Sequence, residues 1–245
     1  MTIGLFIPCY VDQFYPKIAV ATYKLLKKLG YDIEYPKNQT CCGQPLYNSG
    51  CFDDCKPLAK KFIKLFEKYD YIVAPSGSCI SMVKNNYKKI SDETDKIESK
   101  CYELVEFLHD IVQLKDLDVS FDAKVGLHNS CHAHRELNLA SKSELHEKPF
   151  SKIENIISSN VNNIIIKKPS RVDECCGFGG TFSLNEPDVS TQMGLDRIED
   201  HRQNGVEYIT GVDISCLMHL QGLIDREKLP LKTIHIAQIL LGEKL

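Results

Sequence analysis

The tripeptide Cys-Cys-Gly occupies residues 41–43 and again residues 175–177. Adjacent Cα atoms across a trans peptide lie about 3.8 Å apart, whereas a relaxed disulfide needs about 4.4–6.8 Å between them. Each cysteine pair is therefore a poor candidate for a disulfide. Two neighbouring thiolates can instead bind one polynuclear metal cluster, and the glycine lets the backbone turn tightly beside it. The tripeptides predict a metal site, with iron as the expected metal.

Each pair belongs to a set of four cysteines that lies in one half of the chain. The sets are Cys9, Cys41, Cys42 and Cys79 in the first half, and Cys131, Cys175, Cys176 and Cys216 in the second. Flanking residues repeat as well, because residues 3–5 precede Cys9 at the offset at which residues 125–127 precede Cys131. These matches indicate an internal duplication of about 120 residues.

We place the boundary between the two copies near residue 121, which gives a first lobe at residues 1–121 and a second at residues 122–245. A charged stretch at residues 91–100 and a turn near residues 116–122 precede the second copy. No linker rich in proline, glycine or serine separates the halves. We therefore expect two packed lobes related by a pseudo-two-fold axis.

Composition excludes several classes of function. The net charge of −3 offers no basic surface for nucleic acid. The sequence lacks a run of 18 apolar residues and a signal-peptide pattern at Met1, so we expect no transmembrane segment and a cytoplasmic location. In that reducing compartment, 11 cysteines are better explained as metal ligands or redox groups than as a disulfide framework.

Apolar patterns predict alternating strands and helices. We expect strands at residues 3–8, 31–35, 71–74, 124–127, 163–167 and 208–210, and helices at residues 16–29, at residues 58–69 and from Pro187 onward. This alternation predicts an α/β fold with two tandem lobes, each a small parallel sheet flanked by helices. Cys9, Cys79, Cys131 and Cys216 would then follow the carboxyl ends of strands, where open α/β sheets bind their ligands.

The repeated motifs resemble the cysteine-rich CCG-domain iron-sulfur proteins. This family includes the cysteine-rich subunit of heterodisulfide reductase, the iron-sulfur subunits of glycolate and glycerol-3-phosphate oxidation and, most similar to this chain, lactate-utilisation protein A. The resemblance is carried by residues 7–9, 41–45, 75–79, 129–132, 175–182 and 213–219. It implies an iron-sulfur electron-transfer subunit of an L-lactate (2-hydroxy acid) oxidation complex.

The resemblance also implies cofactors and partners. One [4Fe-4S]-type cluster is expected in each lobe, bound by the four cysteines of that lobe. The expected partners are a ferredoxin-type iron-sulfur subunit and a third lactate-utilisation subunit, and such partners could give the chain a peripheral association with the membrane. The sequence has no flavin or nicotinamide motif, so the carbon chemistry is expected on another subunit and no catalytic residue is assigned.

The chain departs from heterodisulfide reductase at one position in each lobe. In that enzyme each motif ends with Cys-x-x-Cys, whereas Met82 and His219 stand at the fifth thiol position here. Imidazole is a better metal ligand than thioether, so His219 is a candidate fifth ligand or hydrogen-bond donor to the cluster. Four further residues, His128, His132, His134 and Arg135, crowd Cys131 and could donate hydrogen bonds to cluster sulfurs.

Two other functions stay open from the residues alone. Four thiolates also suit tetrahedral zinc, which would make the chain a structural or assembly protein with zinc in one lobe or both. A thiol-disulfide reductase like heterodisulfide reductase is the other alternative, although the missing fifth thiols count against it. Cys51, Cys55 and Cys101 have no counterparts in the second half and are interpreted as structural or surface thiols.

Overall fold

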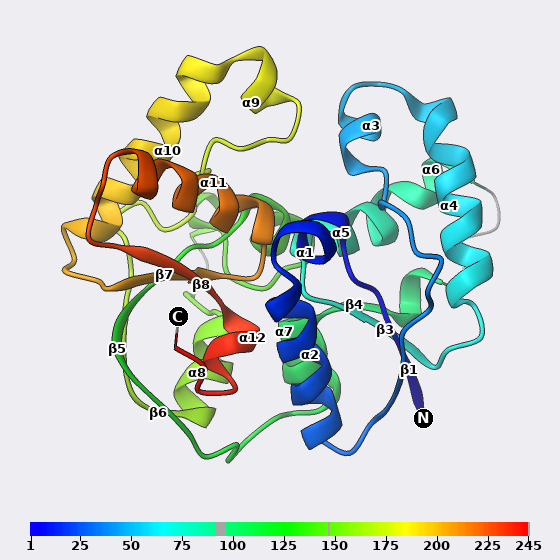
Figure 1. Cartoon of the computed structure of the whole chain (residues 1–245), viewed down its shortest axis with the longest axis horizontal. Helices are drawn as coiled ribbons and strands as arrows, with labels where there is room; N and C mark the ends of the chain where they lie inside the picture. Colours follow the sequence, from blue (N-terminus) through cyan, green and yellow to red (C-terminus); the bar gives the residue numbers. More distant parts are fainter. Residues whose placement is uncertain (92–96, 147, 245) are drawn as a thin grey trace.

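A computed structural model describes residues 1–91, 97–146 and 148–244 of the chain. The predicted α/β class is confirmed: two lobes are each built on a four-stranded parallel sheet (Figure 1). In the first sheet the strand order is β2-β1-β3-β4, with β1 at Thr2–Leu5, β2 at Asp32–Glu34, β3 at Tyr71–Ala74 and β4 at Cys101–Glu103. In the second it is β6-β5-β7-β8, with β5 at Val119–Leu127, β6 at Val161–Lys167, β7 at Tyr208–Gly211 and β8 at Lys232–His235.

The expected lobe boundary at residue 121 stays a prediction, and β5 begins two residues before it, at Val119. Part of the charged stretch expected between the halves, residues 92–96, lies outside the described residues. The predicted strand at residues 3–8 is shorter than expected, since β1 ends at Leu5.

Helices flank both sheets. In the first lobe they are α1 (Cys9–Phe14), α2 (Pro16–Lys28), α3 (Gln44–Asn48), α4 (Phe52–Phe66), α5 (Gly77–Ser81), α6 (Tyr87–Ile90) and α7 (Leu104–Glu106). In the second they are α8 (Lys152–Asn160), α9 (Phe182–Asn185), α10 (Pro187–Arg202), α11 (Ile214–Arg226) and α12 (Ile236–Ile239). None of the helices formed by the described residues is long and apolar enough to cross a membrane.

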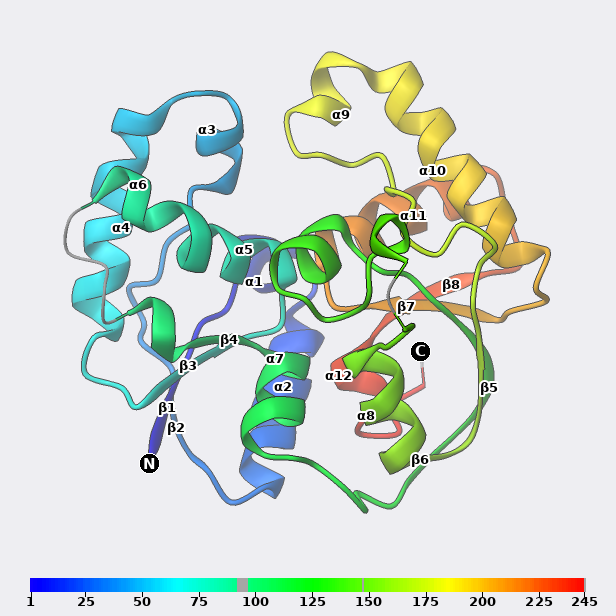
Figure 2. The same cartoon turned by 180° about the vertical axis from the view of Figure 1, so that it is seen from behind.

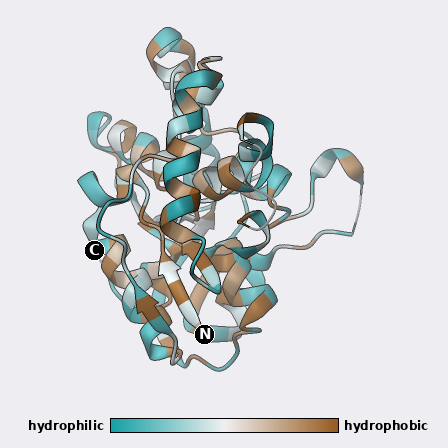
Figure 3. Cartoon of the chain, turned by 90° about the vertical axis from the view of Figure 1, so that its right-hand side faces the viewer, coloured by the Kyte–Doolittle hydropathy of each residue, from teal (hydrophilic) through white to brown (hydrophobic). Residues whose placement is uncertain are grey.

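Local sequence explains the longer helices. Pro16 and Pro187 begin α2 and α10 as predicted, because proline is tolerated where the helical amide has no acceptor. Along α4, Ala59, Phe62 and Phe66 recur at a spacing of three or four residues and are buried, while lysines between them face solvent. Hydrophobic and hydrophilic residues accordingly alternate along the helices in Figure 3. The helix begins and ends earlier than the predicted range of residues 58–69.

Strand register defines which residues of the two lobes are equivalent. Ile3 pairs with Tyr71 in the first sheet as Val125 pairs with Tyr208 in the second. One residue beyond each strand, the Phe6 amide donates to Val73 O at 2.9 Å and the His128 amide donates to Thr210 O at 2.8 Å. Phe6 and His128 therefore occupy the same position in their lobes, and so do Cys9 and Cys131.

The lobes contact each other through matching elements. Helix α2 packs against α12, and α7 packs against α8, as Figures 1 and 2 both show. Helix α1, which follows β1, contacts α11, which follows β7. Helix α5, which follows β3, contacts the π-helical turn His132–Glu136 beyond β5. The carboxyl edges of the two sheets thus meet at the interface between the lobes.

Candidate metal centre

The first set of four cysteines lies at the carboxyl edge of the first sheet. Cys9 begins α1, Cys79 lies in α5, and Cys41 and Cys42 lie in the loop between β2 and α3. The sulfur atoms of Cys9 and Cys41 are 4.0 Å apart. The backbone amide of Gly43 points at the Cys41 sulfur, with 3.4 Å between nitrogen and sulfur.

The second set repeats this arrangement. Cys131 precedes the turn His132–Glu136, Cys175 and Cys176 follow β6, and Cys216 lies in α11. The Gly177 amide lies 3.4 Å from the Cys175 sulfur, the same distance as in the first lobe. All eight predicted cysteines line one cavity of about 200 Å³ at the lobe interface.

Hydrogen bonds between the thiols of each set change their pKa values. Hydrogen bonds from Cys42 and Cys9 lower the pKa of the Cys41 thiol, and the Gly43 amide adds to this effect. In the second lobe, hydrogen bonds from Cys131 and Cys176 likewise lower the pKa of Cys175. Bound metal would displace the thiol protons, since thiolate is the form that coordinates. Four neighbouring thiols beside a glycine turn are a suitable set of ligands for an iron-sulfur cluster.

Gly177 has a backbone conformation that other residues avoid, with φ at 90°. A Cβ atom there would lie 2.6 Å from Ser190 O and 2.8 Å from Met193 Cβ, both in α10. Glycine therefore allows α10 to pack directly against the loop that holds Cys175 and Cys176.

We expect Gly177→Ala to destabilise the chain by about 2 kcal/mol more than Gly180→Ala does. Gly180 also has a positive φ, 65°, but a Cβ there would meet no atom within 4 Å, so the control carries the backbone strain without the clash. Urea unfolding of both variants measures the difference. Equal losses would show that the close approach of α10 is not required.

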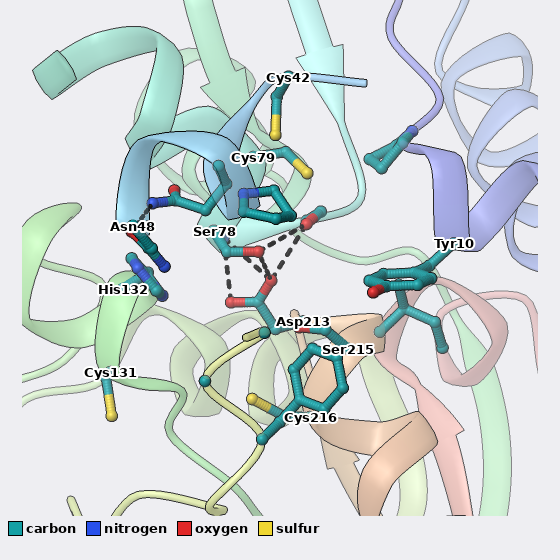
Figure 4. A pocket seen from close by; sticks show the side chains of 18 of the residues that line it. Tyr10, Cys42, Asn48, Ser78, Cys79, Cys131, His132, Asp213, Ser215 and Cys216 are labelled. Carbon is teal, nitrogen blue, oxygen red and sulfur yellow. Dashed lines mark hydrogen bonds between the residues drawn. The ribbon is translucent and has the colours of Figure 1, made fainter. Parts of the chain in front are cut away.

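Asp213 lies in one of the repeated motifs, but its sequence context assigned it no role. Its carboxylate accepts hydrogen bonds from Ser76 Oγ at 3.0 Å, from the Ser78 amide at 2.9 Å and hydroxyl at 2.7 Å, and from Ser130 Oγ at 2.6 Å. In Figure 4 it lies between the sulfurs of Cys42 and Cys79 and those of Cys131 and Cys216. The repeat could have pointed to Asp213. It directly precedes α11 in the second lobe, as Ser76 directly precedes α5 at the equivalent position of the first lobe.

The histidines named from the sequence differ in where they lie. A ring nitrogen of His128 lies within 4.8 Å of the sulfur atoms of Cys176 and Cys216, and His128 is buried. His132 borders the cavity, whereas Nδ1 of buried His134 lies 3.0 Å from Ser130 O. Burial, with the nearby charge of Arg197, holds the pKa of His128 well below its usual range.

The two residues at the fifth thiol position have different surroundings. Nε2 of half-buried His219 lies 3.2 Å from the Ser190 carbonyl oxygen. Met82 is fully buried in the core of the first lobe. The role of His219 as a fifth ligand or donor stays a prediction, and its Nε2 already has an acceptor in α10.

The three unmatched cysteines lie outside the cavity lining. Cys51 is exposed before α4, Cys55 is buried within that helix, and Cys101 is buried in β4. The Cys55 sulfur lies 3.6 Å from the carbonyl oxygen of Gly43, so the Cys55 side chain packs against the glycine turn.

We expect a Cys51→Ser, Cys55→Ala, Cys101→Ala variant to keep the metal content of the wild type. The two buried changes remove small apolar groups, and each should lower the free energy of unfolding by about 1 kcal/mol. Metal analysis and urea unfolding test this. A folded variant that lost metal would show that one of these thiols is a ligand.

Both halves of the chain match a known domain. The model of the family CCG, described as a cysteine-rich domain, matches residues 3–84 and 125–221. The chain is 37% identical over 246 residues to "Lactate utilization protein A" of Halalkalibacterium halodurans, covering 98% of this chain and 96% of that protein. A protein of the same name from Exiguobacterium sp. is 37% identical over 247 residues, which cover 97% of this chain and 96% of the relative.

The fold is similar to that of a solved structure. A hypothetical protein from Helicobacter pylori matches with a TM-score of 0.67 and 11% sequence identity. The match covers 100% of this chain and 49% of that one, so this chain spans about half of that protein.

Proposed function

The chain belongs to the cysteine-rich CCG-domain family, and from this membership we propose that it is an iron-sulfur electron-transfer subunit of an L-lactate (2-hydroxy acid) oxidation system. The observation that supports the proposal most directly is the convergence of two matching sets of four thiols on one cavity. Relatives of nearly equal length named for lactate utilization suggest the substrate class.

Each lobe would hold one [4Fe-4S]-type cluster through its four cysteines, Cys9, Cys41, Cys42 and Cys79 or Cys131, Cys175, Cys176 and Cys216. Such a cluster supplies one-electron transfer when bound. The amides of Gly43 and Gly177 stabilise the thiolate charge on Cys41 and Cys175. The Asp213 carboxylate accepts hydrogen bonds from Ser76 of the first lobe and Ser130 of the second, so it links the lobes between the two sites.

The proposed partners follow from the lactate-utilization role. A ferredoxin-type iron-sulfur subunit and a third lactate-utilisation subunit would deliver and accept electrons, in the cytoplasm. Besides thiols and serines, the cavity lining contains the Asp213 carboxylate, the His132 imidazole and the polar side chains of Tyr10, Gln44 and Asn48, and no residue of this chain is assigned to the carbon chemistry.

Anaerobic purification with assays for iron, sulfide and zinc tests the proposal. We expect about eight iron and eight sulfide per chain, with charge-transfer absorption in the visible. L-lactate, added with the partner subunits, should then bleach this absorption as the clusters are reduced. A colourless chain with zinc in each lobe would instead favour the structural alternative, because zinc has no redox chemistry.

A further inference from the structure

The two lobes have equivalent sets of four thiols, but the side chains that pack behind these sets differ. In the first lobe Phe6 packs edge-on against Phe62, with ring centroids 5.0 Å apart, and lies 5.8 Å from the ring of Phe66. At the equivalent position of the second lobe, His128 contacts Arg197, and its ring centroid lies 6.4 Å from that of His201. A buried polar group thus replaces an aromatic cluster beside only one of the two sites.

The contact with Arg197 determines where the His128 ring carries its proton. Arg197 is fully buried, and its Nε lies 3.2 Å from His128 Nδ1. Guanidinium nitrogens donate hydrogen bonds and cannot accept them, so Nδ1 must be the acceptor. The ring proton then belongs to Nε2, which is buried and has no partner among the residues the structure describes.

We propose that His128 donates this Nε2–H hydrogen bond to a sulfur of the cluster in the second lobe, and that Arg197 fixes the tautomer that makes it possible. The inference rests on the proposed function. The position supports it, because a His128 ring nitrogen lies within 4.8 Å of the Cys176 and Cys216 sulfurs. A buried N–H without an acceptor is costly, and cluster sulfur would supply that acceptor.

Coordination of iron by His128 would need a different tautomer. A ligating Nε2 presents its lone pair, which leaves the proton on Nδ1. That proton would face the Nε–H of Arg197 across 3.2 Å, and two donors would oppose each other. The geometry therefore assigns hydrogen bonding rather than ligation to His128.

The hydrogen bond makes the two sites electronically unequal. Donors to cluster sulfur stabilise the reduced, more negative state and raise the reduction potential. The buried charge of Arg197 acts in the same direction and is partly offset by Asp200, whose Oδ2 lies 3.5 Å from Arg197 Nη1. Phe6 supplies no donor in the first lobe. The second site should hold an electron more tightly than the first, so electrons would collect in the second lobe.

Two substitutions of His128 separate the hydrogen bond from packing. His128→Phe introduces the residue of the first lobe, and His128→Gln keeps an N–H donor near the position of Nε2. We expect His128→Phe to keep its iron and to lower the reduction equilibrium constant of the second site about tenfold, a shift of about 59 mV for a one-electron couple. His128→Gln should retain most of the wild-type value. Phe6→Leu, at the equivalent position, should shift neither site.

The readout is a redox titration of the anaerobically loaded full chain, followed by electron paramagnetic resonance. A variant with Cys175 and Cys176 replaced by serine identifies the signal of the second site. A loaded His128→Phe variant with unchanged potentials would overturn this inference alone, whereas iron-free wild type would overturn the proposed function together with it.

Pulsed resonance on wild type labelled with ¹⁵N-histidine needs no substitution and so does not depend on whether the variants fold. We expect weak coupling from a histidine nitrogen. The nitrogen label is needed because the Gly177 amide beside Cys175 also supplies an exchangeable proton, and only this label separates the two donors. No histidine nitrogen coupling at all would overturn the inference. Strong nitrogen coupling would mean direct ligation and would overturn the hydrogen-bond assignment.

Discussion

Replacing Cys175 and Cys176 by serine is expected to remove the metal of the second lobe and to halve the iron content of the chain. The two residues supply half of the four thiols in their set, and a serine hydroxyl at neutral pH is a poor ligand for iron. The first set is complete within its own lobe, with Cys9 and Cys41 sulfurs 4.0 Å apart. It should therefore still bind its cluster.

Iron and sulfide analysis of the double variant measures this result, with Cys51→Ser as a control because that thiol is exposed and lies outside the cavity lining. Replacing Cys41 and Cys42 by serine should remove the other half of the iron, that of the first lobe. Loss of all iron from either variant would show that the lobes share a single cluster. Unchanged iron would remove the vicinal pairs from the ligand set.

Much of the fold could be predicted because each structural motif occurs twice in the sequence, so one copy supported the interpretation of the other. Ile-Gly-Leu at residues 3–5 and Val-Gly-Leu at residues 125–127 precede Cys9 and Cys131 at the same offset, and both segments lie in central strands of parallel sheets. Pro16 and Pro187 marked helix starts through a local constraint on the backbone. Cysteines placed after strands then had to meet at the carboxyl edge, since all strands of each sheet are parallel.

The edge strands β4 and β8 could not be predicted from apolar alternation, because each has only three or four residues. Each of these strands leads directly into a helix with a capping box, formed by Glu103 and Glu106 at the start of α7 and by His235 and Gln238 at the start of α12. The sequence pattern of a capping box usually begins with Ser, Thr, Asp or Asn. Glu103 and His235 depart from that pattern, so the helix starts were not marked in the sequence either.

The buried pair of His128 and Arg197 lay beyond sequence reasoning for another reason. His128 was noted beside Cys131, but its partner lies on α10, 69 residues away along the chain. A fully buried arginine is rare, so a local pattern would place Arg197 at the surface. Only the pairing of β5 with its neighbours and the packing of α10 bring the two side chains together.

Asp213→Ala is expected to lower the free energy of unfolding by about 3 kcal/mol and to reduce iron in both lobes. The buried carboxylate accepts from Ser76 and Ser78 of the first lobe and from Ser130 of the second. Its removal leaves buried donors on both sides without an acceptor, at about 1–3 kcal/mol for each unsatisfied group, and the terms do not add fully. Ser78 adjoins Cys79, so the loss should reach the first site as well as Cys216 in the second.

Asp213→Asn makes the test sharper because the amide keeps the size of the side chain. Its oxygen can still accept from some of the serines, but its NH₂ group would face donors such as the Ser78 amide. We expect a stability between those of Asp213→Ala and wild type. Asp188→Ala, at an exposed position of α10, is the control and should lower the free energy of unfolding by no more than about 1 kcal/mol.

Urea unfolding and iron analysis of the three variants show whether Asp213 links the two lobes or acts only on its own lobe. If Asp213→Ala lost iron from the second lobe alone and kept wild-type stability, Asp213 would support only Cys216. The two sites would then keep their spacing through the packing of α2 on α12 and α7 on α8.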